Sequence, residues 1–390
     1  PPLPPGWDDF QAIFKGGYSG WGYRSSYVDA AGRLRLRNTP VPRASATAAE
    51  KDRSYSNHVM ADKAVAFLRK HRDDRAPYFL EVSTYATHSS LRRAWPGEPR
   101  FPAAFRDRPH AGRPGGNCGA VACSSLGTDD LVGYEDDRRD NAPVRVVRGK
   151  VVAAPAWNTV PRTMGVTEAL RDFRNRARMA QSIDRLIGRV RAEVGPDTYV
   201  VVTSDNGYHL RQHGLNGGKG TAYDTDTRVP LLVAGPGVVP GRRSQFVSNI
   251  DVAPTLERLA GIAPVGRAGR SFGGALREPR ARGKRFVFFE HTNNFSAPGD
   301  PDPDVIPERD IEFVPSYVAV RSARGLLVRV DLDRSWTGVR YAWELYRYDR
   351  PWEDRNVFAE DWRKPWAREL RERLLAFDGC ERAACRAAAL

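Results

Sequence analysis

Residues 199–207 read Tyr-Val-Val-Val-Thr-Ser-Asp-Asn-Gly, an apolar run followed at once by polar residues and a glycine. A nearly all-apolar run of this length is typical of a strand that is buried on both faces. Such strands occur in α/β proteins, in which helices cover both sides of a sheet. The stretch therefore predicts a strand over residues 199–203, with Asp205 and Asn206 immediately past its carboxyl end.

Helix-like and strand-like patterns alternate on both sides of this strand. Apolar positions recur at helical spacing in three segments, residues 60–71, 166–193 and 252–260. Short apolar runs predict further strands at residues 78–83, 229–233 and 285–290. This alternation favours a mostly parallel sheet with helices on both faces.

The rest of the chain is organised differently. Residues 88–160 are rich in Arg, Pro and Gly and predict a long excursion with a small hairpin near 144–154. The composition changes near residue 291, after which we expect antiparallel strands and a closing helix, at residues 317–321, 326–330, 340–348 and 361–377. We therefore expect two domains, an α/β domain over residues 1–290 and a smaller antiparallel subdomain over 291–390.

The composition is that of a globular protein with a basic surface. The 390 residues hold 61 Lys and Arg against 47 Asp and Glu, a net charge of +14. The excess is scattered arginine, which fits solvated surface or a GC-rich coding bias as well as a polyanion partner. A concentrated basic block with interleaved aromatics is missing, which argues against nucleic acid. No apolar run approaches the roughly 18 residues that span a membrane.

The four cysteines form two close pairs, Cys118 with Cys123 and Cys380 with Cys385. Neither pair has a histidine or further cysteine at zinc-finger spacing. Local disulfides in an oxidising compartment are the expectation, which predicts a secreted or periplasmic protein. Free thiols in a reducing compartment are the alternative.

Polar residues that follow the predicted strands are the candidates for chemistry. Asp205 and Asn206 offer a carboxylate and an amide oxygen, ligands that suit a hard divalent cation. An ordinary turn is the alternative, since Asp, Asn and Gly favour turns. His88 follows the predicted strand 78–83, on the rim where Asp205 is expected, and could donate a proton to a leaving group. A purely structural histidine is its alternative.

Lys219 lies in the run Gly217-Gly218-Lys219-Gly220-Thr221. The run is not a nucleotide-binding phosphate loop, because His213 stands where that motif needs its first glycine. A lysine between glycines leaves room for a tetrahedral oxyanion to approach closely. A plain surface loop is the alternative.

Several of these stretches together resemble the sulfatase family of the alkaline-phosphatase-like superfamily. The resemblance rests on residues 77–88, 203–228 and 249–262, and on Glu344-Leu345-Tyr346 with Asn356 near the end. The opening Pro-Pro-Gly-Trp-Asp at residues 4–8 is similar to a secreted branch of N-acetylglucosamine-6-sulfatase-like and arylsulfatase-like proteins. The resemblance implies an alkaline-phosphatase-like α/β fold and hydrolysis of sulfate monoesters of a carbohydrate or an aryl alcohol.

The resemblance also implies roles for the four candidate residues. Asp205 and Asn206 match two Ca²⁺ ligands, Lys219 matches the lysine that contacts the sulfate, and His88 matches the histidine near the leaving-group oxygen. These roles agree with the chemistry, because cleavage of a sulfate ester builds negative charge on the leaving oxygen and the sulfuryl oxygens.

Two family features do not match. The family nucleophile is a formylglycine made from a Cys/Ser-x-Pro-x-Arg motif, which this sequence lacks, and the paired N-terminal acidic metal ligands are missing too. We therefore expect a sulfatase truncated at its N-terminus and inactive by itself. The alternatives are a phosphodiesterase or phosphonate hydrolase of the same superfamily and a non-catalytic polyanion-binding protein.

Overall fold

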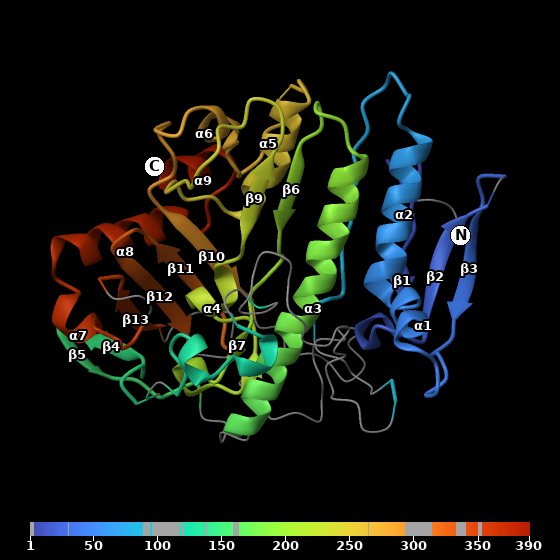
Figure 1. Ribbon diagram of the computed structural model, residues 1–390. Helices are drawn as coiled ribbons and strands as arrows, with labels where there is room; N and C mark the ends of the chain where they lie inside the picture. The colour runs from blue at the N-terminus through green and yellow to red at the C-terminus, as the bar shows by residue number, and fades with distance from the viewer. Residues whose placement is uncertain are drawn as a thin grey trace. The chain divides into compact units, whose positions relative to one another are not determined.

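A computed structural model describes residues 4–29, 31–88, 94–95, 118, 121–135, 137, 139–158, 164–263, 265–292, 314–332, 341–349 and 353–390 (Figure 1). The chain forms two compact units, one of Pro1–Asp130 with Val166–Thr198 and one of Leu131–Gly165 with Tyr199–Leu390. The expected boundary between residues 290 and 291 lies within the second unit. Division into domains at that point stays a prediction, and most of the excursion at 88–160 lies outside the described residues.

The first unit holds a three-stranded antiparallel sheet that we did not predict. It consists of β1 (Ile13–Phe14), β2 (Tyr23–Val28) and β3 (Leu34–Thr39), in that order. Most β3 side chains are exposed and its arginines break the apolar pattern, so the sequence carries no clear strand signal.

Three α-helices belong to the described part of the first unit. They are α1 (Ala48–Arg53), α2 (Ser56–Lys70) and α3 (Val166–Glu193), which confirms the two predicted long helices. In the buried contact between α2 and α3, the Asn57 amide donates to the Ser182 hydroxyl at 2.8 Å. Arg185 on α3 binds both carboxylate oxygens of Asp52 at 2.8 Å each, which ties α1 to the same pair.

The strand predicted at residues 78–83 is wrong. These residues belong to no strand, and the Phe79 side chain is 60% exposed. An apolar run becomes a strand only where a neighbouring strand supplies hydrogen bonds, and no described segment pairs with it.

The second unit is built on a six-stranded antiparallel sheet. Its order is β10 (Val287–His291), β11 (Tyr317–Arg321), β12 (Gly325–Asp331), β13 (Tyr341–Arg347), β4 (Val144–Val147) and β5 (Lys150–Ala153). The structure thus confirms the predicted antiparallel strands and the hairpin. The strand predicted at 285–290 also joins this sheet, whereas the sequence places it in the preceding α/β domain.

Successive residues of the central strands point into two different cores. Leu327 and Leu345 pack with α8 (Pro365–Phe377) and α7 (Phe358–Asp361), whereas Leu326 and Tyr346 pack against the loop that follows β8. This alternation is the period of two that a strand imposes. A last helix, α9 (Ala383–Ala388), follows α8.

The predicted strand that precedes Asp205 and Asn206 is β6 (Val200–Thr203). It pairs with β9 (Leu231–Ala234) in an antiparallel ladder. Every ladder in the described part of the chain is antiparallel, so the expectation of a mostly parallel sheet is wrong for those residues. The mixed α/β class itself is confirmed. An apolar run indicates burial but not the direction of its neighbour, and here the chain turns back before β9.

Smaller elements lie around β6 and β9. They are β7 (His209–Leu210), β8 (Gly217–Gly218), α4 (Asp224–Thr227), α5 (Val252–Leu259) and α6 (Gly273–Arg277). Short 3-10 turns occur at Gly17–Ser19, Cys123–Ser125, Thr128–Asp130, Gln212–Gly214 and Asn249–Asp251.

Both predicted disulfides are present, Cys118–Cys123 and Cys380–Cys385. Among the described residues, none of the helices combines the length and the apolar character that crossing a membrane requires.

Candidate functional site

Asp205 and Asn206 form a tight turn directly after β6. The Asn206 N–H donates to Asp205 Oδ1 at 2.9 Å, and the Ser204 hydroxyl donates to the Asn206 carbonyl at 2.9 Å. Gly207 follows, and a β carbon there would overlap the carbonyl oxygen of Thr225. The turn therefore needs its glycine for a close backbone approach, and it leaves the Asp205 side chain exposed.

Asn249 holds this turn from a second direction. Its amide nitrogen lies 2.9 Å from the carbonyl oxygen of Ser204 and 3.4 Å from that of Asp205. The 3-10 turn that carries Asn249 is fixed in turn by a buried ion pair, in which Lys284 Nζ lies 2.6 Å from Asp251 Oδ2. We did not single out Asn249 from the sequence, although it lies within the stretch 249–262 that carries the family resemblance.

Lys219 follows β8, which pairs with β7. Its Nζ lies 3.4 Å from Asn206 Oδ1, so the structure brings together the predicted cation and a predicted metal ligand that are 13 residues apart in the sequence. A cation and oxygen ligands at one place can bind an anion and a metal ion side by side. The individual roles of Lys219, Asp205 and Asn206 stay predictions.

A buried carboxylate anchors the loop after Lys219. Asp226 accepts hydrogen bonds from the Thr221 backbone N–H at 2.9 Å and from the Thr221 hydroxyl at 2.7 Å. His209 Nδ1 lies 2.9 Å from the other oxygen of the same carboxylate. The His209 ring also packs on Gly218, where an added β carbon would lie 3.0 Å from Nε2. His209 and Asp226 therefore hold the residues on both sides of Lys219, a function that no sequence motif indicated.

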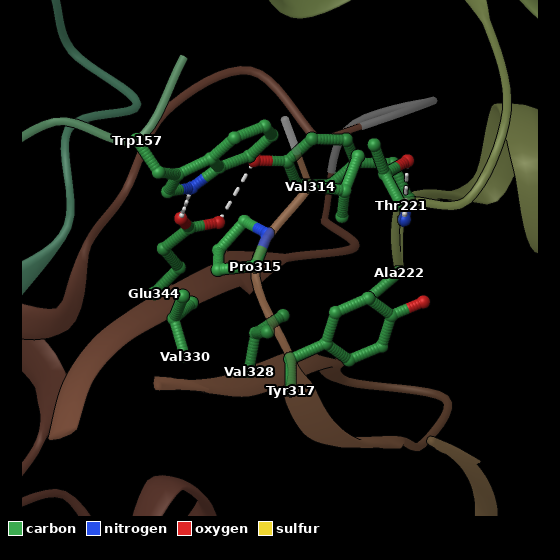
Figure 2. Close-up of a pocket in the computed structure, with 10 residues that line it drawn as sticks. Trp157, Thr221, Ala222, Val314, Pro315, Tyr317, Val328, Val330 and Glu344 are labelled. Carbon is green, nitrogen blue, oxygen red and sulfur yellow. Dashed lines mark hydrogen bonds between the residues drawn. The ribbon is translucent and has the colours of Figure 1, made fainter. Parts of the chain in front are cut away.

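The antiparallel sheet supports the same loop from another side. The Tyr317 hydroxyl donates to the Gly220 carbonyl at 3.1 Å. On β13 of the same sheet, the Glu344 carboxylate accepts hydrogen bonds from the Trp157 indole N–H at 2.8 Å and from the Tyr223 hydroxyl at 2.8 Å. Burial raises the pKa of Glu344 above its ordinary value. Figure 2 shows Trp157 and Glu344 joined by a hydrogen bond on one side of the cluster, with Thr221 and Tyr317 on the other side.

A small cavity lies inside this cluster, lined among others by Trp157, Thr221, Tyr317 and Glu344 (Figure 2). Its volume is about 10 Å³, room for about one water molecule. A substrate cannot enter a space of that size. The cluster is therefore support for the Lys219 loop and not itself a binding site.

His88 belongs to the first unit. Its backbone N–H closes a turn on the Tyr85 carbonyl at 2.8 Å, and its ring centroid lies 4.4 Å from that of Tyr18. The side chain is half-buried. These contacts orient the ring, and its role near the leaving group stays a prediction.

Asp205 and Asn206, the predicted metal ligands, could supply only part of a calcium site. Within the described residues, no group of three or more His, Cys, Asp or Glu side chains is arranged to hold a metal ion. The exposed Asp205 carboxylate and the Asn206 amide oxygen are the hard donors that Ca²⁺ prefers, but this ion takes six to eight oxygens. The donor chemistry fits Ca²⁺, and the remaining ligands must come from other groups.

Comparison with known proteins shows the family and the fold of the chain. The sulfatase family model matches residues 7–262, about two thirds of the chain. The chain belongs to the sulfatase family. Its β6 turn and its Lys219 loop both lie within the matched residues.

The curated relatives are longer proteins. An arylsulfatase of Volvox carteri is 31% identical over 220 residues, which cover 53% of this chain and 32% of that protein. The N-acetylglucosamine-6-sulfatase of Bos taurus is 30% identical over 216 residues, 54% of this chain and 33% of that protein. The chain thus spans about a third of the length of these relatives.

Solved structures show the same fold. One protein, solved in complex with its substrate D-glucosamine-2-N,6-O-disulfate, has a TM-score of 0.60 over 96% of this chain and 76% of its own, at 18% identity. A phosphonate monoester hydrolase from Silicibacter pomeroyi has a TM-score of 0.56 over 93% of this chain and 65% of its own, at 21% identity. The alkaline-phosphatase-like fold implied by the sequence is confirmed.

Proposed function

We propose that this chain is part of a sulfatase that hydrolyses sulfate monoesters of a carbohydrate or an aryl alcohol. The observation that carries the proposal is the 3.4 Å separation of Lys219 Nζ and Asn206 Oδ1 within the stretch that matches the family. This pair offers an ammonium group for a sulfuryl oxygen beside ligands for a cation.

The chemistry needs charge stabilisation at fixed positions. In sulfate ester cleavage, negative charge grows on the sulfuryl oxygens and on the leaving oxygen. Lys219 binds a sulfuryl oxygen, and Gly220 leaves space for the tetrahedral group, because among the described residues a β carbon there would meet only His291 Cε1, at 3.8 Å. Because Asp226 and Tyr317 fix the loop around Lys219, the ammonium group needs little rearrangement during the reaction.

Other groups complete the proposed reaction. Asp205 and Asn206 hold Ca²⁺, which when bound neutralises charge on the sulfate oxygens. His88 donates a proton to the leaving-group oxygen. The family resemblance implies a formylglycine nucleophile; the printed sequence contains no Cys/Ser-x-Pro-x-Arg motif, so the residues named here bind and orient the ester.

The substrate class and compartment follow from the relatives and the disulfides. Similar proteins carry the names N-acetylglucosamine-6-sulfatase and extracellular sulfatase. Two disulfides fit an oxidising compartment. We therefore propose a sulfated carbohydrate as substrate and a secreted or periplasmic location. Phosphonate monoester hydrolysis is the second candidate, because a neighbour of the same fold has that name.

The test uses the full-length protein that carries this chain, assayed on 4-nitrophenyl sulfate and on a phosphonate monoester with calcium present. Lys219→Ala should lower kcat/KM on the sulfate ester by about 100-fold or more, the typical loss of one oxyanion-binding group. Lys150→Ala, at an exposed position on β5, is the control and should leave turnover unchanged. Preference for the phosphonate, or turnover insensitive to Lys219→Ala, would overturn the proposal.

A further inference from the structure

His291 ends β10 beside the Lys219 loop. A β carbon on Gly220, the residue after Lys219, would lie 3.8 Å from His291 Cε1. His291 is half-buried. Neither the sequence nor the family resemblance indicated this residue.

Tyr317 connects the histidine to the loop. It lies opposite His291 in the register between β10 and β11, and the two rings stack with centroids 5.5 Å apart and planes inclined by 26°. The hydroxyl of the same Tyr317 donates to the Gly220 carbonyl. One side chain therefore fixes the imidazole and the backbone next to Lys219 at the same time.

The chemistry of the imidazole restricts what it can bind. Burial lowers the pKa of His291, and its ring hydrogen-bonds with the backbone of Val314. A neutral imidazole has one donor nitrogen and one acceptor nitrogen. With the donor given to the Val314 carbonyl, the other nitrogen accepts. An acceptor repels sulfate oxygens, but it suits a hydroxyl or amide N–H on the group that carries the sulfate.

We propose that His291 is a specificity-determining residue, which accepts a hydrogen bond from a hydroxyl or amide group of a carbohydrate whose sulfate lies at Lys219. This inference rests on the proposed function. It also separates two substrate classes, because a simple aryl sulfate has no such donor next to its ester.

The experiment compares two substrates in the full-length protein, N-acetylglucosamine 6-sulfate and 4-nitrophenyl sulfate. His291→Leu should lower kcat/KM on the sugar sulfate by about 10- to 100-fold, the range for one lost hydrogen bond to a substrate. Turnover of the aryl sulfate should change less than about threefold. His291→Gln keeps an acceptor and should retain more sugar activity than His291→Leu. His71→Leu, in the first unit, is the matched control.

Other results would overturn the inference. Equal losses on both substrates would mean that His291 only supports the Lys219 loop, and unchanged turnover of both would place it outside the binding site. If the wild-type protein hydrolyses neither substrate, the proposed function fails but calorimetry still tests His291. His291→Leu should then weaken binding of N-acetylglucosamine 6-sulfate and leave binding of inorganic sulfate unchanged; equal effects, or no binding of either, would refute the inference.

Discussion

His209 Nδ1 lies 2.9 Å from Asp226 Oδ1, and the two side chains are only 3% and 2% exposed. The same carboxylate accepts both donors of Thr221, two residues after Lys219. One buried acid therefore fastens β7 and the Lys219 loop to α4. Burial of a carboxylate is unfavourable unless hydrogen-bond donors surround it. Asp226 therefore needs the donors of Thr221 and His209, and the Lys219 loop needs Asp226 to keep its position.

Asp226→Asn tests this dependence. His209 Nδ1 lies 2.9 and 3.0 Å from the two Asp226 oxygens, and Thr221 donates twice to one of them. A neutral amide leaves one acceptor oxygen for these donors and removes the charge, so the hydrogen bonds weaken. We expect the free energy of unfolding to fall by about 2–3 kcal/mol, as for lost hydrogen bonds to a charged group. Turnover of 4-nitrophenyl sulfate should fall more than about tenfold because Lys219 is displaced.

Denaturant unfolding and steady-state kinetics on the same preparation measure both effects of that change. Asp197→Asn, at an exposed position before β6, is the matched control and should behave as wild type. An Asp226→Asn protein with wild-type stability and turnover would show that the buried hydrogen bonds do not position Lys219.

Glu344 should make stability depend on pH. Its pKa is raised by burial above the ordinary value of 4.5, so the folded protein holds this proton more tightly than the unfolded chain. The resulting stabilisation is complete below about pH 4.5 and is lost as the pH rises through the folded-state value. Glu344→Gln cannot ionise, and we expect the fall in stability above pH 4.5 to be smaller in that variant.

Urea unfolding at a series of pH values from 4.5 to 8 checks this expectation. Glu290→Gln, exposed on β10, serves as the control, because an exposed carboxyl contributes little to the change of unfolding free energy with pH. Parallel pH profiles for wild type and Glu344→Gln would contradict the prediction.

The disulfide Cys380–Cys385 should stabilise the tail modestly. It closes a loop with a sequence separation of only 5, and loop-closure entropy grows with loop length. Replacing both cysteines with serine should cost about 2 kcal/mol at most. Unfolding of the double variant, compared with wild type under non-reducing conditions, gives the value. A loss of unfolding free energy well above 3 kcal/mol would mean that the disulfide also stabilises structure outside the loop that it closes.

The sequence predicted elements whose signal is local. The helix Val166–Glu193 and the strand Tyr317–Arg321 have the predicted bounds because a regular apolar period runs through each of them. Strand direction is not local, and β6 pairs antiparallel with β9 where we expected a parallel neighbour. The run at 78–83 failed for the same reason, since a strand depends on a partner that periodicity does not reveal.

The residues of the candidate site also fall into two groups, those marked by the local sequence and those recognised only in the folded chain. The sequence marks Asp205, Asn206 and Lys219 as candidates, because charged and amide groups lie beside glycines there and the same stretch resembles the sulfatase family; their roles stay predictions. Asn249 and Tyr317 could not be predicted, because they act through hydrogen bonds to backbone carbonyls 45 and 97 residues away in the sequence. No spacing rule connects residues so far apart, and only the folded chain brings them together.

The turn that carries Asp205 provides the last prediction, on metal affinity. Asp205→Ala removes the only carboxylate of the proposed Ca²⁺ ligand pair, and we expect calcium binding to be lost in calorimetric titrations of the full-length protein after EDTA treatment.

Asn249→Ala keeps both ligands but releases the carbonyls of Ser204 and Asp205. Its calcium affinity should fall about 10-fold, since groups that orient ligands typically contribute 10- to 100-fold. Asn38→Ala, exposed on β3, is the control for loss of an asparagine. If Asp205→Ala keeps the wild-type calcium affinity, Asp205 is not a metal ligand. If only Asn249→Ala keeps the wild-type calcium affinity, the turn holds its shape without the Asn249 amide.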